Sequence, residues 1–133
     1  MATTDLEQLL TRGVAEVIVR EELLARLRSG RKLRLKLGFD PSKPDLHVGH
    51  AVVLRKIRQF QDLGHQVVLI VGDWTAQIGD PSGRDVSRQM LGPAEVKVKA
   101  QTYIEQFSLI VDPQRTEVRW QSEWFGKFGL ADV

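Results

Sequence analysis

The chain has 133 residues, of which 42% are hydrophobic, and 19 basic against 17 acidic residues give a formal net charge of +2. This length and composition suit one domain with a core of its own, and the small net charge does not by itself require a nucleic-acid partner. The absence of cysteine excludes disulfides, a thiolate zinc site and a cysteine nucleophile. No apolar run approaches the roughly 20 residues that span a bilayer, so we expect a cytoplasmic protein with no membrane partner.

Residues 1–32 predict a helical segment ahead of the main body. Leucines at positions 6, 9 and 10 follow helical spacing before Gly13 interrupts the pattern. Residues 21–29 continue with leucines on one face and basic residues in the last turn, and Gly30 stops this second helix. We therefore divide the chain into an N-terminal helical segment, 1–32, and a main body, 33–133.

The main body begins with a pattern of strand, helix and strand. Residues 33–37 alternate leucine with charged residues, which predicts a strand with one covered face that ends at Gly38. Residues 51–63 return apolar side chains every three or four positions, which predicts an amphipathic helix. The continuous run VVLIV at 67–71 is typical of a parallel strand that is buried on both faces. These elements predict an α/β fold with a parallel sheet.

The second half of the main body extends this sheet. A glycine-rich loop over residues 72–88 precedes a predicted helix over 93–109 and a third strand over 117–120. A further helix starts at residue 122 and runs to the end of the chain without a cap or a closing strand. From this pattern we expect a chain that is cut before its fold is complete.

Polar clusters follow the carboxyl ends of all three predicted strands, where open α/β sheets bind their ligands. The first holds GFDPS at 38–42 and HVGH at 47–50, the second is the loop over 72–88, and the third spans 121–124. Phe39 and Trp124 within them are interpreted as packing residues. Each cluster alone also fits ordinary turns and helix caps.

The pair His47 and His50 has three possible uses. Metal binding needs more than two ligands, and the common helical zinc motif spaces its histidines by four. Capping or packing at the start of the helix is the second use. The third is phosphate binding, because a helix N-terminus presents free N–H groups, imidazole adds donors, and Gly49 leaves room for a flat base. The spacing alone does not decide among them.

The second cluster is not a P-loop, because GDPSGR at 79–84 lacks the required lysine and spacing. Asp80 on its tight turn suits capping or the binding of an ammonium group. Arg84 and Arg88 fit either a solvated loop or a phosphate clamp.

Taken together, these motifs carry a resemblance to a known family. The segment LKLGFDPSKPDLHVGHAVVLRKIRQFQDLGHQVVLIVGDWTAQIGDPSGR resembles the amino-terminal half of the catalytic domain of bacterial tyrosyl-tRNA synthetases, which are class I synthetases. HVGH matches the class I "HIGH" signature, and GFDP before it and IGDPSG after it make the combination specific. The resemblance implies that residues 33–133 form the first half of a Rossmann-like nucleotide-binding fold, truncated before the KMSKS-like motif, which is absent.

The resemblance implies activation of tyrosine by ATP with Mg²⁺, transfer of tyrosine to tRNA(Tyr), and a homodimer in the full-length enzyme. It implies an ATP site formed by Gly38, Asp40, Ser42, His47, Gly49 and His50. In this site the two histidines would contact the phosphates, Gly49 would admit the adenosine, and Asp40 with Ser42 would flank the adenylate. It implies catalytic roles for His47 and His50 and a pyrophosphate clamp at Arg84 and Arg88. No protein-held metal site is implied.

The tyrosine site implied by the resemblance consists of Lys36, Thr75, Asp80 and Gln121. Asp80 would bind the ammonium group of the tyrosine. Lys36 occupies the position where one branch of the family has a tyrosine that meets the substrate phenol. Two alternatives stay open beside the ligase. The first is a nucleotide-binding or inert structural fragment without turnover, and the second is a tryptophan-specific relative.

Overall fold

In the computed structural model, which describes residues 3–41, 45–78 and 92–127, three parallel strands form one sheet in the order β1-β2-β3. The strands are β1 (Arg34–Phe39), β2 (Gln66–Val71) and β3 (Thr116–Trp120). Leu37 of β1 pairs with Leu69 of β2, which pairs in turn with Val118 of β3. The predicted α/β fold with a parallel sheet is confirmed.

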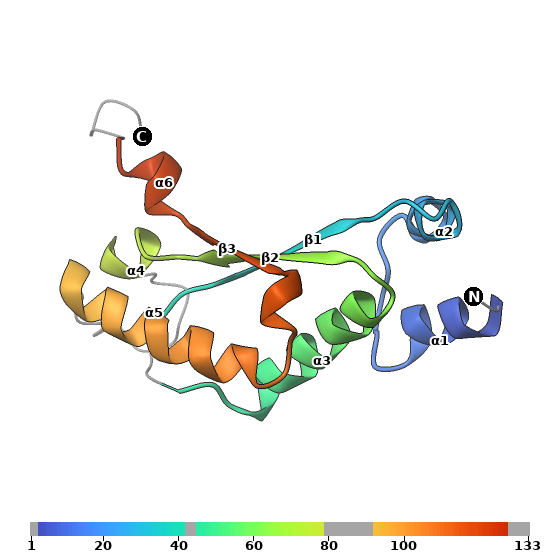
Figure 1. Cartoon of the computed structure of the whole chain (residues 1–133), viewed down its shortest axis with the longest axis horizontal. Helices are drawn as coiled ribbons and strands as arrows, with labels where there is room; N and C mark the ends of the chain where they lie inside the picture. The colour runs from blue at the N-terminus through green and yellow to red at the C-terminus, as the bar shows by residue number, and fades with distance from the viewer. Residues whose placement is uncertain (1–2, 42–44, 79–91, 128–133) are drawn as a thin grey trace.

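Helices connect and precede the strands (Figure 1). Helix α3 (Val48–Asp62) joins β1 to β2, and α4 (Thr75–Ile78), α5 (Pro93–Ser108) and the 3₁₀ turn η1 (Pro113–Arg115) lie between β2 and β3. Helices α1 (Thr3–Thr11) and α2 (Arg20–Arg28) come before the sheet, and α6 (Ser122–Phe125) follows it. Within the described ranges, no helix is long and apolar enough to cross a membrane.

The structure differs from the sequence prediction in the details of several elements. Strand β1 does not end at Gly38 but continues to Phe39, because Gly38 still pairs with Ile70. The predicted loop over 72–88 contains the short helix α4, whose apolar residues are too few to reveal a helical period. Helix α3 starts at Val48, ahead of the apolar pattern over 51–63, and this places His47 and His50 at its first turn as predicted. The predicted helix from residue 122 is wrong in its length, because α6 ends at Phe125 with Gly126 as its C-cap, and the rest of the prediction, beyond residue 127, lies outside the described residues.

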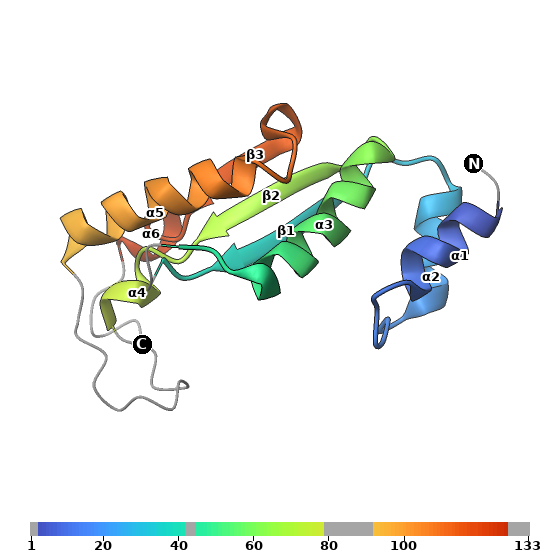
Figure 2. The same cartoon turned by 90° about the horizontal axis from the view of Figure 1, so that it is seen from below.

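One face of the sheet carries the main core. Helices α3 and α5 lie on the same side of the sheet in Figures 1 and 2, and their residues Leu54, Ile57 and Phe107 pack with Val67 and Leu69 of β2. The side chains on alternate positions of the strands point to this face. The start of α3 lies next to the carboxyl end of β1, since residues of both line one cavity.

The opposite face of the sheet is largely polar. Arg34 and Lys36 of β1 are exposed on it, as the alternating sequence predicts, and Arg34 reaches across β2 to Glu117 of β3 at 2.7 Å. Arg119 also pairs with Glu117, at 3.2 Å. On this face of β2, Val68 is buried, whereas Gln66 and Ile70 are only half-buried, so the predicted burial of β2 on both faces is complete only on the side of α3 and α5.

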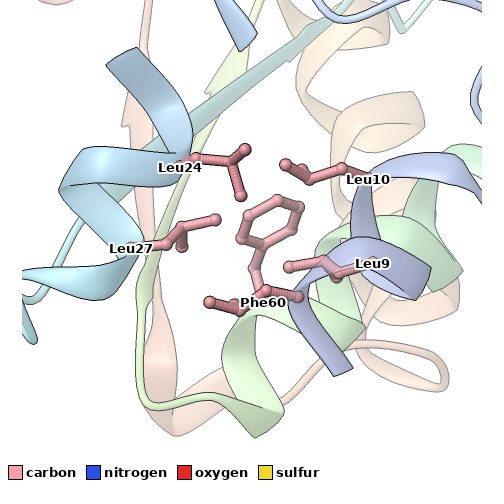
Figure 3. Packing of buried hydrophobic residues seen from close by; sticks show 6 residues of the cluster. Leu9, Leu10, Leu24, Leu27 and Phe60 are labelled. Atoms are coloured by element: carbon pink, nitrogen blue, oxygen red, sulfur yellow. The ribbon is translucent and has the colours of Figure 1, made fainter. Parts of the chain in front are cut away.

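The N-terminal helices share a hydrophobic cluster with the main body (Figure 3). The Phe60 ring of α3 sits among leucines of both helices: Leu9, Leu10, Leu24 and Leu27. The Lys56 ammonium group of α3 also donates to the Leu9 carbonyl at 2.8 Å and to the Arg12 carbonyl at 2.9 Å, at the end of α1. Burial and, secondly, the charge of Arg12 lower the pKa of Lys56. The segment 1–32 is thus anchored on α3.

Candidate functional site

The three polar clusters meet at the carboxyl edge of the sheet. The Gly72 N–H donates to the Phe39 carbonyl at 2.8 Å, and the Gln121 N–H donates to the Val71 carbonyl at 2.9 Å. The parallel ladder is therefore prolonged by one residue beyond the strands, which brings the loops after β1, β2 and β3 side by side.

The Thr75 hydroxyl links these three loops. Its Oγ1 lies 2.8 Å from Asp40 Oδ1, 2.9 Å from Gln121 Oε1 and 3.3 Å from the Gly72 carbonyl. The Thr75 N–H also donates to Gln121 Oε1 at 3.1 Å, which fixes the orientation of that amide. Because a hydroxyl has one proton, it donates to one acceptor at a time. The structure thus brings together three of the residues predicted from sequence.

Gly72 makes this network possible. A Cβ added at Gly72 would meet Asp40 Oδ1 at 1.9 Å and Thr75 Oγ1 at 2.8 Å, so no side chain fits there without moving the carboxylate. Gly38 differs, since the nearest atom to a Cβ added there is the Ile70 carbonyl oxygen at 3.9 Å. The space at Gly38 is open to a ligand rather than filled by the chain.

His47 and His50 cap the start of α3 reciprocally. His47 is the N-cap residue, and its Nδ1 accepts from the Gly49 N–H at 3.1 Å. The Nδ1 of His50 accepts from the His47 N–H at 3.2 Å. The capping use of the histidines is therefore present in the structure, in the form of a capping box.

The capping box also sets the tautomer of both rings. Because each Nδ1 accepts a hydrogen bond, each neutral imidazole carries its proton on Nε2. Among the described residues, neither Nε2 has a hydrogen-bond partner in the structure. Capping and phosphate binding are thus compatible, since Nδ1 serves the helix and Nε2–H remains available to an acceptor.

The electrostatics favour a neutral His50 ring. The two ring centroids lie 4.0 Å apart. Burial lowers the pKa of His50, and the neighbouring His47 lowers it further. No acidic residue lies in the first turn of α3, so the free N–H groups and the positive end of the helix dipole have no built-in counter-charge.

Gly49 has a steric reason to be glycine. A Cβ there would meet the His47 ring at 2.9 Å. The prediction from sequence was that Gly49 leaves room for an adenosine; in this structure the same space receives the imidazole that caps the helix.

Two cavities lie at this edge of the sheet, and the first is lined by both histidines. A largely apolar one of about 270 Å³ lies between α3 and α5 and is lined by His47, Gly49, His50, Gly38, Phe39 and Tyr103, among others. The second, of about 250 Å³, is lined by Gly38, Phe39, Asp40, Ile70, Gly72 and Gln121. Gly38 and Phe39 line both, so the cavities adjoin along the end of β1.

Three supporting residues were not predicted from sequence. The Tyr103 ring of α5 stacks on Phe39 with centroids 5.0 Å apart and meets His50 edge-on at 6.1 Å. Gln106, also on α5, accepts from the Leu46 N–H at 2.8 Å, and Asp73 accepts from the Ser122 N–H at 2.9 Å. In the sequence, Tyr103 and Gln106 are recognisable only as helix residues and Asp73 only as a residue that follows a strand. Such a position does not show which residue each side chain contacts. Phe39 packs as predicted, whereas Trp124 is 40% exposed.

The remaining predicted residues are not brought into the network. Lys36 is exposed on the polar face of the sheet, two positions before Gly38. It is not among the described residues that line either cavity at this edge. Ser42, Asp80, Arg84 and Arg88 lie outside the described residues. Across residues 3–41, 45–78 and 92–127, no group of three or more histidines or carboxylates is placed to hold a metal ion.

Comparisons with known proteins show the family of the chain. The family described as "tRNA synthetases class I (W and Y)" matches residues 28–133. A tyrosine–tRNA ligase of Dehalococcoides mccartyi strain CBDB1 is 69% identical over 128 residues, covering 96% of this chain and 32% of that protein. The Thermotoga maritima tyrosine–tRNA ligase is 59% identical over 126 residues, covering 95% of this chain and 31% of that protein.

The fold agrees with a solved structure. The tyrosyl-tRNA synthetase from Archaeoglobus fulgidus, crystallised with L-tyrosine, superposes with a TM-score of 0.74 at 23% identity, over 93% of this chain and 36% of that one. The chain spans about a third of the length of the curated relatives that it matches. With the family match extending over residues 28–133, the chain belongs to the class I tRNA synthetases of the W and Y type.

Proposed function

We propose that this chain carries the ATP- and tyrosine-binding edge of a tyrosine–tRNA ligase of the cytoplasm. The observation that carries the proposal is the adjacency of two Nε2–H donors at the start of α3 to the Asp40–Thr75–Gln121 network at the same sheet edge. The names of its relatives point to the same activity.

The ATP side is assigned to the start of α3. Two imidazole rings whose Nε2–H groups are not used by the helix cap, next to the positive end of a helix dipole, suit the oxygens of a triphosphate as directed hydrogen-bond donors. We assign the adenosine to the apolar cavity beside Gly49 and the phosphates to Nε2 of His47 and His50. Asp40, with Ser42, would flank the adenylate.

The reaction in this proposal is an in-line displacement. A carboxylate oxygen of tyrosine forms a bond to the α-phosphorus as the bond from that phosphorus to the bridging oxygen breaks and pyrophosphate leaves. The negative charge that develops on the phosphoryl oxygens is stabilised by donors that are already oriented, which is where such donors contribute most. The tyrosyl group then passes to the 3′ end of tRNA(Tyr), releasing AMP.

The tyrosine side is assigned to the cavity over Gly38 and Gln121, with Thr75 fixing the walls. Lys36 lies further down the polar face of β1, and Asp80 would bind the ammonium group, with Arg84 and Arg88 on the pyrophosphate. Mg²⁺ would arrive with ATP, since this ion is commonly held by substrate phosphates and few protein ligands. A homodimer of the full-length enzyme belongs to the same proposal.

Calorimetry with ATP, with tyrosine and with a stable tyrosyl-adenylate analogue tests this assignment on the chain itself. We expect the analogue to bind and Gly38→Ala to weaken it, because the methyl group enters the cavity. No heat with any of the three ligands would instead identify an inert fragment. Binding without adenylate formation would identify a nucleotide-binding fragment, and displacement of tyrosine by tryptophan at equal concentration would identify the tryptophan-specific relative.

A further inference from the structure

A basic pocket lies at the opposite edge of the sheet. It has a volume of about 370 Å³ and lies where Lys32 precedes β1 and His65 precedes β2, next to the end of α2. In Figure 1 this end of the sheet is the one nearest α2, away from α4 and α6. A strand of six residues separates the two edges by about 20 Å, so this pocket is distinct from the proposed active site.

Unpaired cations line the pocket. Residues 26–36 contain six basic residues and no acidic one: Arg26, Arg28, Arg31, Lys32, Arg34 and Lys36. Arg26 pairs with Glu22 and Arg34 with Glu117, whereas the described residues provide no ion pair for Arg28, Arg31 or Lys32. These three are the ones that line the pocket.

The negative end of the α2 helix dipole repels an anion in this pocket, but only weakly. A helix C-terminus carries a partial charge of about −0.5, against three full positive charges from the side chains. The N–H groups of Ser29 and Gly30 already donate to the carbonyls of Ala25 and Leu27 and partly satisfy that end. The balance of charge in the pocket stays positive.

His65 gives the pocket a directed donor. The residue is only 7% exposed, and its Nδ1 accepts from the Leu33 N–H at 3.3 Å, so the neutral ring carries its proton on Nε2. In the described part of the chain, no buried side-chain nitrogen or oxygen lacks a hydrogen-bond partner. Because no described residue accepts from the His65 Nε2–H, this group is not sealed in the core, and His65 is one of the residues that line the pocket.

We propose that this pocket binds a phosphate group, with the His65 Nε2–H as the directed donor and Arg28, Arg31 and Lys32 as the counter-charge. A donor without an acceptor and cations without carboxylates both call for an anion, and two guanidinium groups match the oxygens of a phosphate. The source that we favour is a phosphodiester of an RNA backbone. The choice of RNA rests on the proposed function, whereas the phosphate chemistry does not.

The first experiment follows the chain by ¹⁵N NMR during titration with inorganic phosphate. We expect shifts at the amides of Gly30 and Gly64 and at the His65 ring, and about tenfold weaker binding in the double variant Arg31→Gln, Lys32→Gln. Arg55→Gln is the matched control, since Arg55 is exposed on α3 and does not line the pocket. Shifts that are absent, or equally weakened by the control, would overturn the phosphate site.

A second variant separates the donor from the fold. His65→Asn places an amide oxygen near the position of Nδ1 and so keeps an acceptor for the Leu33 N–H, but it removes the outward donor. We expect weaker phosphate binding with an unchanged melting temperature. Unchanged phosphate affinity in this variant would overturn the role of His65.

The RNA arm uses fluorescence anisotropy with tRNA over a range of salt concentrations. If the backbone places one phosphate in the pocket, the slope of log Kd against log[salt] should fall by about 1 in the double variant and by less than half of that in Arg55→Gln. Phosphate binding with an unchanged RNA slope would overturn the RNA source and assign the pocket to free phosphate or a nucleotide. Neither experiment uses tyrosine or an adenylate. Their results therefore do not depend on whether the proposed ligase activity is correct.

Discussion

The Thr75 hydroxyl lies 2.8 Å from the carboxylate of Asp40, although 35 residues separate the two in sequence. Asp40 follows β1 and Thr75 follows β2, so this contact joins the loop assigned to the nucleotide with the loop assigned to tyrosine. Gln121 after β3 completes it. The two halves of the proposed site therefore share one hydroxyl group. We expect a substitution in one half to alter ligand binding in the other.

Thr75→Val keeps the shape of the side chain and removes the hydroxyl. We expect it to destabilise the chain by about 1 kcal/mol, as for the loss of a partly buried hydrogen bond, and to weaken binding of the adenylate analogue. Urea unfolding and calorimetry measure the two effects. Thr75→Ser is the control, because it keeps the hydroxyl; if both variants bind the analogue alike, the hydroxyl does not position the site.

Gly72→Ala and Gly38→Ala add the same methyl group at neighbouring places on this edge. At Gly72 the methyl group collides with the Asp40 carboxylate, so we expect a loss of about 1–3 kcal/mol in the free energy of unfolding. At Gly38 the nearest atom is 3.9 Å away, so we expect a change within about 0.5 kcal/mol and a loss of ligand affinity instead. Equal destabilisation by both, measured by urea unfolding, would contradict the geometry.

His50→Asn distinguishes capping from phosphate binding. The shorter amide keeps an acceptor near the position of Nδ1 but removes the outward Nε2–H. In a full-length ligase that contains this chain, we expect ATP–pyrophosphate exchange to slow by about 10²–10³ with little change in tyrosine affinity, as for the loss of a transition-state donor. An unchanged exchange rate would reduce His50 to a helix cap. The melting temperature of the same variant shows whether the cap survives.

Stability should decrease as the pH falls below about 6.5, the ordinary pKa of histidine. Burial lowers the pKa of His65, and burial with His47 lowers that of His50, so the unfolded chain binds more protons than the folded one below this pH. The stabilisation is fully present above about pH 6.5 and is lost as the pH falls toward the lowered folded values. Urea unfolding at pH 7.5 and 5.5 measures this difference.

The control for the pH effect is His65→Asn, which should reduce the difference between the two pH values. Glu117 also has a lowered pKa, chiefly because Arg34 donates to it, but a carboxylate of this kind loses its effect only below about pH 4.5. Stability that is equal at the two pH values, or higher at pH 5.5, would show that the histidines are not what titrates.

Phe60→Ala should affect both the N-terminal helices and the main body. Its ring fills the cluster formed by leucines of α1 and α2, and truncating a buried phenylalanine costs about 3–5 kcal/mol. We expect a single unfolding transition at a lower urea midpoint. Two separate transitions in the unchanged chain would instead support the division at residue 32 as a boundary between independent units.

The neighbouring Lys56→Met variant tests the polar part of the same anchor. It removes the hydrogen bonds to the carbonyls of Leu9 and Arg12 while keeping a long apolar side chain. We expect a smaller loss, of about 1–2 kcal/mol. Faster hydrogen exchange confined to α1 would show that the contact holds the N-terminal segment locally.

The sequence by itself determined the three strands, the longer helices and their order, but not the short helix α4. Alternation over 33–37 predicted β1, the apolar run predicted β2, and helical spacing predicted α3 and α5, because each pattern reflects the period of one element. It also brought His47 and His50 together, since residues three apart at the start of a helix are neighbours whatever the rest of the chain does. The sequence left metal, capping and phosphate open at this pair.

Only the tertiary structure decided which residues share a site. The contact of Thr75 with Asp40 and Gln121, the steric need for glycine at 72, the stacking of Tyr103 on Phe39 and the position of His65 in the lining of the basic pocket all join segments far apart in sequence. These contacts depend on strand order and on register, where a shift by one residue would turn each side chain to the other face. A local pattern carries no information about that register, which is set by the packing of the whole sheet against α3 and α5.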